Sequence, residues 1–154
     1  MAAPGTHADR DGARLMQQRA REGEFEAVLE ALAARCVHAA GERADEALRV
    51  LRAMARRAGR EVFLRQSEAV IMRRDRWDAL TGLDVPTLLL WGRQDQFASI
   101  ETARAIAARV RDARLVVLDD CGHLPTLERP EACLPAVRAW LTTVAEHVVG
   151  APRR

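Results

Sequence analysis

An aspartate and a histidine lie shortly after two apolar runs of this 154-residue sequence. Asp95 follows the run at 85–91, and His123 follows the run at 114–118. If both runs are parallel strands, their carboxyl ends meet at one rim of a sheet, where open α/β sheets bind ligands. An aspartate there can accept the Nδ1 hydrogen of the imidazole, so that the other ring nitrogen acts as a general base. On spacing alone, a turn aspartate and a loop histidine with structural roles remain the alternative.

The elements around these two residues follow a strand–helix–strand–helix order. The run at 85–91 is almost continuously apolar, which is typical of a parallel strand covered on both faces. Ser99 can cap a helix at 100–110, and 114–118 predicts a second strand. A last helix carries six apolar residues at helical spacing: Leu134, Val137, Trp140, Leu141, Val144 and Val148. This order predicts a parallel βαβ unit with a right-handed crossover. Two strands are fewer than such sheets usually contain.

Pro135 is out of place in the interior of that last helix. Proline lacks the N–H of a helical residue and kinks or breaks a helix interior. We therefore expect either a kink at Pro135 or a helix that begins near it, with a turn at 130–134.

The first half of the chain has a helical pattern and no convincing strand. Residues 1–13 are small and polar and contain Gly and Pro, which predicts a flexible N-terminus. Residues 14–80 form a helical segment, in which two predicted buried faces recur at steps of three and four: Phe25, Val28, Leu29 and Leu32, then Ala47, Leu51, Met54 and Ala58. Gly59 is expected to end the second of these helices, and a short helix follows at 62–72. The strand–helix part occupies 81–150.

Several short motifs in the second half occur in a fixed order. They are Asp84-Val85-Pro86-Thr87, Trp91-Gly92-Arg93-Gln94-Asp95, Cys121-Gly122-His123-Leu124-Pro125 and Glu128-Arg129-Pro130-Glu131. Together they resemble the C-terminal part of the α/β-hydrolase family, in particular its bacterial esterase and lactonase-like members. The resemblance implies an α/β fold, with 14–80 as a helical cap segment and 81–150 as the last two βα units of the parallel sheet. It also implies that Asp95 is the acid and His123 the base of a Ser–His–Asp triad that hydrolyses a small-molecule carboxylic ester or lactone.

The nucleophile of such a triad is not visible in the sequence. The family places it in a G-x-S-x-G turn upstream of the acid and the base, and this chain contains no such motif. Its only serines are Ser67, inside a predicted helix, and Ser99, a predicted helix cap. By the resemblance, Met1 falls just after the sixth of eight strands. We therefore expect the isolated chain to be inactive, because one oxyanion donor alone is worth roughly 10²–10³-fold in rate.

The remaining reactive residues favour structural roles. The three cysteines, Cys36, Cys121 and Cys133, are an odd number at irregular spacing, which does not indicate a disulfide framework. Cys121 lies two residues from His123, and Cys36 two residues from His38, which raises the possibilities of a thiol nucleophile or a metal site. Zinc ligands usually have other spacings, and residues two apart on a helix point to different faces. We expect no metal and no cofactor, since hydrolysis by a triad needs only water.

Composition limits the classes of partner. With 49% apolar and 30% charged residues and a net charge of +2, the chain indicates neither nucleic acid nor membrane as a partner. All 24 basic residues are arginine; Arg49, Arg52, Arg56 and Arg60 line one helix face, for which a solvated surface is favoured over a polyanion site. With neither a signal peptide nor a membrane span in view, the expected location is cytoplasmic. A non-catalytic remnant, or an interaction protein that pairs its strand edge with a second copy or an N-terminal half, is the alternative function.

Overall fold

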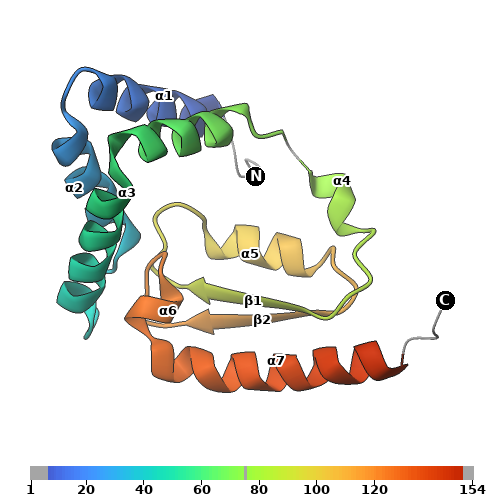
Figure 1. Ribbon diagram of the computed structural model, residues 1–154. Coiled ribbons are helices and arrows are strands. Elements are labelled where there is room, and N and C mark those ends of the chain that lie inside the picture. The colour runs from blue at the N-terminus through green and yellow to red at the C-terminus, as the bar shows by residue number, and fades with distance from the viewer. Residues whose placement is uncertain (1–6, 75, 151–154) are drawn as a thin grey trace.

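A helical part at one end and a strand–helix part at the other make up the structure (Figure 1). The computed structural model describes residues 7–74 and 76–150. In the helical part lie α1 (His7–Arg21), α2 (Phe25–Cys36) and α3 (Ala44–Met72), with α4 (Trp77–Leu80) in the connection. The second part consists of β1 (Thr87–Gly92), α5 (Ile100–Ala107), β2 (Ala113–Leu118), α6 (Pro125–Glu128) and α7 (Pro130–Gly150). The predicted α/β class and the order of the elements are confirmed.

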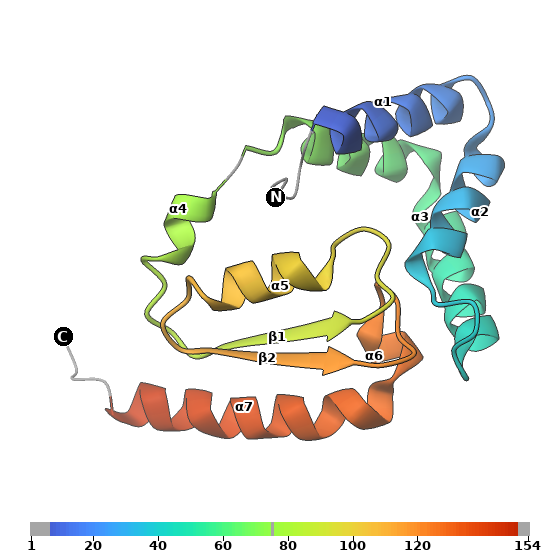
Figure 2. The ribbon, with the colours of Figure 1, turned by 180° about the vertical axis from the view of Figure 1, so that it is seen from behind.

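The two strands are parallel, as predicted, and pair from Thr87 opposite Ala113 to Gly92 opposite Leu118. Helix α5 lies on one side of the strands and α7 on the other, and both strands point toward the end where α2 and α3 lie (Figures 1 and 2). Ser99 caps α5 as expected, because its hydroxyl accepts a hydrogen bond from the N–H of Thr102. The carboxyl ends of β1 and β2 therefore open toward the helical part.

The helical part begins earlier than the sequence pattern predicted. Helix α1 starts at His7, so the prediction of a flexible segment over 1–13 is wrong for 7–13, while 1–6 lie outside the described residues. Asp11 and Arg14 form an ion pair one turn apart, and α1 packs along α3. These contacts outweigh the roughly 1 kcal/mol that Gly12 costs a helix interior.

Gly59 marks a sharp change of direction inside α3. Its φ of 79° and ψ of 170° are not helical, and only glycine adopts such angles without strain. The helix axis bends within α3, so that the segment after the bend runs along α1 while the segment before it runs along α2 (Figures 1 and 2). The expected break at Gly59 is confirmed, and α1, α2 and the two halves of α3 form one packed unit.

Burial matches the predicted helix faces only in part. On α2, Val28 and Leu29 are buried as expected. On α3, Ala47 is buried, but Met54 is 60% exposed and Ala58 is exposed as well, so that half of the predicted face is wrong. Ala47 belongs to a core cluster with Val37 and Ala44, against which Leu124 and Leu127 pack, and this cluster does not extend to Met54.

The arginine stripe on α3 is paired with acidic residues rather than merely solvated. Arg52 forms an ion pair with Glu30 at 2.7 Å, and Arg56 contacts both Glu30 and Glu26 of α2. Arg60 pairs with Glu61 beside it. All these groups remain substantially exposed, and such pairs each stabilise a fold by about 1 kcal/mol or less. Arg52 and Arg56 of the stripe therefore link α3 to α2.

Helix α7 begins at Pro130, so the prediction of a turn at 130–134 is wrong. Pro135 lies inside the helix and has no N–H to donate to the carbonyl of Glu131. The buried side of α7 consists of Cys133 and Ala136, with Trp140 hydrogen-bonded through its Nε1 to the carbonyl of Pro86 at 2.9 Å. This Trp140 contact attaches the middle of α7 to the segment that leads into β1.

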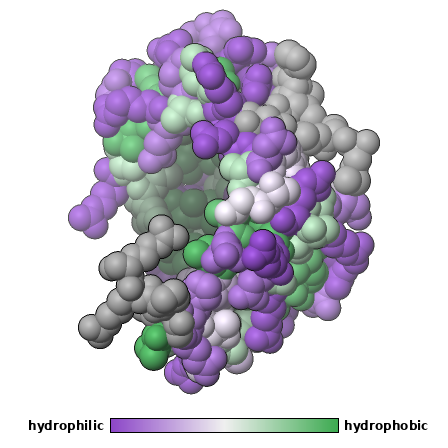
Figure 3. Space-filling model, turned by 90° about the vertical axis from the view of Figure 1, so that its right-hand side faces the viewer, coloured by the Kyte–Doolittle hydropathy of each residue, from purple (hydrophilic) through white to green (hydrophobic). Residues whose placement is uncertain are grey.

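Many apolar residues near the sheet are not covered. Leu134 and Leu141, two of the apolar residues at helical spacing on α7, are 50% and 52% exposed. The apolar residues of β1 are only half-buried, and within the described residues the sheet has two strands. Viewed from the side of α4, apolar surface is visible in a hollow near the centre of the molecule (Figure 3). The chain thus contains more apolar residues around the sheet than the described elements can bury. None of the helices in the described part of the chain is both long and apolar enough to span a bilayer.

Candidate active site

Asp95 and His123 meet at the carboxyl ends of the two parallel strands. Oδ2 of Asp95 lies 2.8 Å from Nδ1 of His123, although the residues are 28 positions apart. Asp95 is in the turn after β1, and His123 is in the loop between β2 and α6. The parallel register places Gly92 opposite Leu118, so both loops start at the same rim. The structure therefore brings together the two residues that the spacing of the sequence singled out.

The turn after β1 holds the Asp95 carboxylate in one orientation. Oδ1 of Asp95 accepts hydrogen bonds from the N–H groups of Phe97 at 2.7 Å and Ala98 at 3.2 Å. The indole N–H of Trp91 donates to the carbonyl of Ala98 at 2.8 Å, which fixes the far side of the turn. The Asp95 side chain is only 6% exposed. One oxygen is thus used by the main chain, and the other is left for the histidine.

Direct contact between the two loops sets their spacing. Gln94 donates its N–H to the carbonyl of Cys121 at 2.9 Å, and its side-chain oxygen accepts from the N–H of Cys121 at 3.0 Å. Gly92 is required here, because a Cβ at this position would overlap the carbonyl oxygens of Cys121 and Gly122. The side chain of Arg93 pairs with Asp119 on the outside of the same junction. These contacts hold the turn that carries Asp95 (the aspartate turn) against the loop that carries His123 (the histidine loop).

His123 lies between the loop and the cap. Its main-chain N–H donates to the carbonyl of Cys36, the last residue of α2, at 2.7 Å. The ring packs against Phe97 with 5.0 Å between ring centroids, and the guanidinium of Arg35 covers the Phe97 ring at 4.3 Å. The His123 side chain is 44% exposed, and within residues 7–74 and 76–150 no hydrogen bond reaches its Nε2. That nitrogen is therefore available to a reacting group.

The pKa values of His123 and Asp95 both differ from the ordinary values of these groups. The hydrogen bond to Asp95 raises the pKa of His123 above its ordinary value of 6.5, an effect larger than the opposing effect of partial burial. Burial acts to raise the pKa of Asp95, but the hydrogen bonds from His123, Phe97 and Ala98 outweigh it, so the pKa lies below the ordinary 3.8. The charged forms of the two groups favour each other. An aspartate of this kind orients the imidazole and stabilises its protonated form during acid–base chemistry.

Glu128 is a structural feature of the site that sequence reasoning missed. Its side chain is almost fully buried at 2% exposure, and it accepts three main-chain hydrogen bonds, from His38, Gly122 and Leu124, at 2.8, 2.9 and 3.0 Å. Gly122 and Leu124 are the neighbours of His123 in the chain. The motif Glu128-Arg129-Pro130-Glu131 was the available signal, but a motif does not indicate which main-chain groups its first glutamate contacts.

The nucleophile expected for a triad is absent from the described site. Ser67 lies within α3, and Ser99 caps α5, so neither serine is placed as a nucleophile. Cys121 is fully buried, and burial raises the pKa of its thiol to about 12, which makes a thiolate nucleophile unfavourable at neutral pH. The structural role expected for Cys121 therefore fits its position beneath the histidine loop.

The predicted placement of His38 is corrected by the end of α2. The helix stops at Cys36, and Val37 is extended, so His38 lies in the following loop and not on a helix surface. The main-chain N–H of His38 donates a hydrogen bond to the carboxylate of Glu128. Among the described residues no three His, Cys, Asp or Glu side chains are grouped in a way that would hold a metal ion. The expected absence of a metal stays a prediction.

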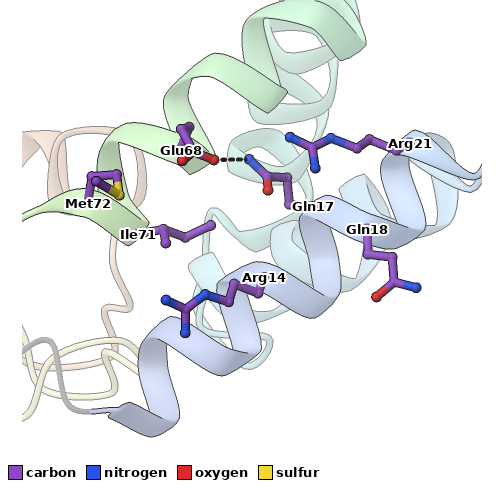
Figure 4. A pocket seen from close by; sticks show the side chains of 7 residues that line it. All are labelled: Arg14, Gln17, Gln18, Arg21, Glu68, Ile71 and Met72. Atoms are coloured by element: carbon purple, nitrogen blue, oxygen red, sulfur yellow. Dashed lines mark hydrogen bonds between the residues drawn. The ribbon is translucent and has the colours of Figure 1, made fainter.

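Two cavities lie in the helical part. An apolar cavity of about 170 Å³ lies between α2 and α3, and its lining residues include Phe25, Leu29, Cys36, Leu51 and Phe63. A more open, polar hollow of about 460 Å³ lies between α1 and the end of α3 (Figure 4). There Gln17 donates to Glu68 at 3.0 Å and to the carbonyl of Leu64 at 3.2 Å. Both donor hydrogens of that buried amide are used to join the helices, which indicates a structural role.

Comparison with known proteins identifies the class. The model of the alpha/beta hydrolase family matches residues 1–136, and the chain therefore belongs to this family. The two parallel strands with an aspartate and a histidine at one rim are consistent with that membership.

An esterase, a lactonase and a lipase are among the similar proteins. A thermophilic esterase from Thermogutta terrifontis superposes with a TM-score of 0.80 and 29% identity, over 94% of this chain and 53% of that one. The enol-lactonase from Burkholderia xenovorans LB400 gives a TM-score of 0.73 and 25% identity, over 92% and 52%. Rat monoacylglycerol lipase ABHD6 is 30% identical over 88 residues, which are 55% of this chain and 25% of that lipase. The chain thus spans about half the length of the solved structures that it resembles.

Proposed function

We propose that this chain carries the acid and the base of an ester- or lactone-hydrolysing triad. Asp95 would orient His123 and stabilise its protonated form, and Nε2 of His123 would take the proton of a serine and later activate water. The single observation that carries this proposal is the 2.8 Å contact between Asp95 and His123, with Nδ1 occupied and the ring edge exposed. The serine and the oxyanion donors would come from polypeptide outside these 154 residues.

The apolar cavity in the cap supports a substrate with a short apolar chain. Cys36 is one of its lining residues, and the carbonyl of Cys36 accepts a hydrogen bond from the N–H of His123. Its volume of about 170 Å³ is below the ~300–1,000 Å³ of pockets for drug-sized ligands. We therefore propose that a short acyl or alkyl group occupies this cavity while the ester or lactone carbonyl lies beside His123. A cytoplasmic location stays part of the same proposal.

The first test is an assay of the purified 154-residue chain with p-nitrophenyl butyrate and with a short lactone. The expected result is no turnover above that of the His123→Ala variant, because the chain lacks a nucleophile. The matched control is His147→Ala, since His147 lies in the last turn of α7, away from the site. Turnover that is lost in His123→Ala and kept in His147→Ala would contradict the expected inactivity of the isolated chain.

The second test concerns the whole native protein. An antibody against the C-terminal region would capture it from its source for measurement of its intact mass, ester hydrolysis and labelling with a fluorophosphonate, which reacts with activated serines. We expect a mass above 17.1 kDa and a label outside the present sequence, and an engineered His123→Ala form should lose both labelling and hydrolysis. A protein of 17.1 kDa that is neither labelled nor active would overturn the triad proposal.

The uncovered apolar residues favour a second candidate, a partner-dependent protein without activity of its own. Val85, Leu134 and Leu141 are each at least half exposed around β1 and α7, and within the described residues only one edge of β1 is paired. A second copy, or an N-terminal half of the fold, would cover them. Light scattering of the purified chain tests the first case: a stable monomer would exclude self-association through this edge.

A further inference from the structure

Glu128 is a buried carboxylate that joins two segments far apart in the sequence. Its Oε2 accepts from the N–H of His38 in the cap and from the N–H of Gly122, while Oε1 accepts from the N–H of Leu124. Both oxygens are thus used. A buried carboxylate is costly unless it is hydrogen-bonded, and hydrogen bonds to an ionised acceptor are stronger than neutral ones. The three contacts are therefore among the firmest at this junction.

Each of the three residues of the histidine loop at 122–124 donates a main-chain hydrogen bond. Gly122 and Leu124 are bonded to Glu128, and His123 between them donates to the carbonyl of Cys36. No side chain fits at Gly122, because a Cβ there would lie 2.7 Å from the carbonyl oxygen of Cys36 and 2.8 Å from the nitrogen of His38. The cap segment and the histidine loop are consequently in direct main-chain contact, with Glu128 beneath both.

The position of the His123 ring depends on this main chain. The described hydrogen-bond partner of the ring is Asp95 alone, and the ring is close to half exposed. Packing against Phe97 supports it on one side, but Phe97 belongs to the aspartate turn. A shift of the loop would therefore change the Nδ1–Oδ2 distance directly.

We propose that Glu128 is a positioning residue that fixes the cap segment 36–38 and the histidine loop 122–124 as one unit, and thereby holds His123 against Asp95. A role of Glu128 in catalysis rests on the function proposed above. The coupling of the cap segment to the histidine loop does not depend on that function. Arg43 of the cap pairs with Glu131 of α7 at 3.2 Å, and this contact is on the surface, with the Glu131 side chain 74% exposed. It provides a matched glutamate that also touches the cap but not the loop.

Hydrogen exchange on the unmodified chain gives the first test. If Glu128 couples the two segments, the amides of His38, Gly122 and Leu124 open together, and their protection factors agree within about threefold, as in one cooperative unit. Protection of His38 that differs from that of Gly122 and Leu124 by more than about tenfold would overturn the coupling. No variant needs to fold for this measurement.

The second test compares Glu128→Gln with Glu131→Gln by NMR, well below the melting temperature of each. Glutamine has one acceptor oxygen, and its NH₂ would face a main-chain N–H, so we expect protection of the three amides to fall about 10–100-fold. The hydrogen-bonded Nδ1–H resonance of His123 should broaden or move upfield in Glu128→Gln and stay in place in Glu131→Gln. A lower melting temperature with an unchanged Nδ1–H resonance would show a merely stabilising role.

Glu128→Asp serves as the conservative variant. It keeps the charge and both oxygens but is one methylene shorter, so it should restore part of the Nδ1–H signal that Glu128→Gln loses. If neither variant folds, the exchange test on the unmodified chain decides the proposal. None of these measurements uses a substrate, so a failure of the coupling and a failure of the hydrolase function are distinguishable.

Discussion

The carboxylate of Asp95 divides its two oxygens between the main chain and a side chain. Oδ1 accepts from Phe97 and Ala98, while Oδ2 lies 2.8 Å from Nδ1 of His123. This division orients the carboxylate before any histidine contact is made. The imidazole then meets an acceptor of fixed direction, and its tautomer is set with Nδ1 protonated and Nε2 free to accept.

The acid strength of His123 should depend on Asp95. An NMR titration of the imidazole should give a pKa for His123 above 6.5 in the unmodified chain, because Asp95 stabilises the protonated ring. In Asp95→Asn that pKa should fall toward or below 6.5, since a neutral amide gives less stabilisation and partial burial then dominates. Asp78→Asn, at an exposed position on α4, is the control and should not move it. An unchanged His123 pKa in Asp95→Asn would contradict the pairing.

The pair should also contribute to stability within a limited pH range. The raised pKa of His123 gives stability that is complete below 6.5 and lost as pH rises through the folded-state value. The lowered pKa of Asp95 gives stability that is present above 3.8 and lost as pH falls through its folded-state value. The difference in unfolding free energy between the unmodified chain and Asp95→Asn should therefore be largest between pH 3.8 and 6.5. Urea titrations at several pH values would measure it, and a difference that does not change with pH would contradict this account.

Gly92 and Gly122 should not tolerate alanine. A Cβ at either position would overlap main-chain atoms of the opposing segment, and such overpacking typically costs about 1–3 kcal/mol or more. We expect Gly92→Ala to be the more severe, because its Cβ would lie 1.9 Å from the nearest main-chain atom, against 2.7 Å for a Cβ at Gly122. Gly12→Ala is the control: nothing lies within 4 Å of its Cβ, and alanine in a helix interior should stabilise by about 0.5–1 kcal/mol. Thermal unfolding by circular dichroism would rank the three variants.

The cysteines should react in the order of their burial. Cys121 and Cys133 are buried and have raised thiol pKa values, whereas Cys36 is half-buried, with a thiol pKa that burial also raises. With a chromogenic disulfide reagent at pH 8, Cys36 should react first and the other two only on unfolding in guanidinium. The variant Cys36→Ala should lack the first phase. Labelling of Cys121 in the folded chain at the rate seen in guanidinium would revive the thiol-nucleophile hypothesis.

The local features of this chain were predictable from short stretches of sequence. The apolar runs became β1 and β2, Ser99 capped α5, and Gly59 broke α3, because each depends on residues close in the chain. The Asp95–His123 pair was also within reach, since parallel strands bring their following loops to one rim. Asp95 and His123 are far apart in the sequence, but the known geometry of two parallel strands predicts that they lie close together.

The faces of the helices were predicted less well. Periodicity indicated which apolar residues share a helix face, but Met54 is exposed where burial was expected, and Leu134 and Leu141 of the α7 repeat are half exposed. A repeat of apolar residues indicates which side chains share a helix face. It does not indicate which part of that face a neighbouring element covers. That depends on how many elements the fold contains, and the described strands and helices are too few to cover all of these residues.

The sequence by itself determined the strands, the helix break at Gly59 and the two ionisable residues at the sheet rim, because these follow from local periodicity, glycine conformation and strand direction. Only the tertiary structure decided how that rim is held. Glu128 bonds to His38, 90 positions away, and the guanidinium of Arg35 covers Phe97, which in turn packs against His123. Such contacts arise where separate segments are packed together, and their partners are selected by position in space rather than by any regular spacing along the chain.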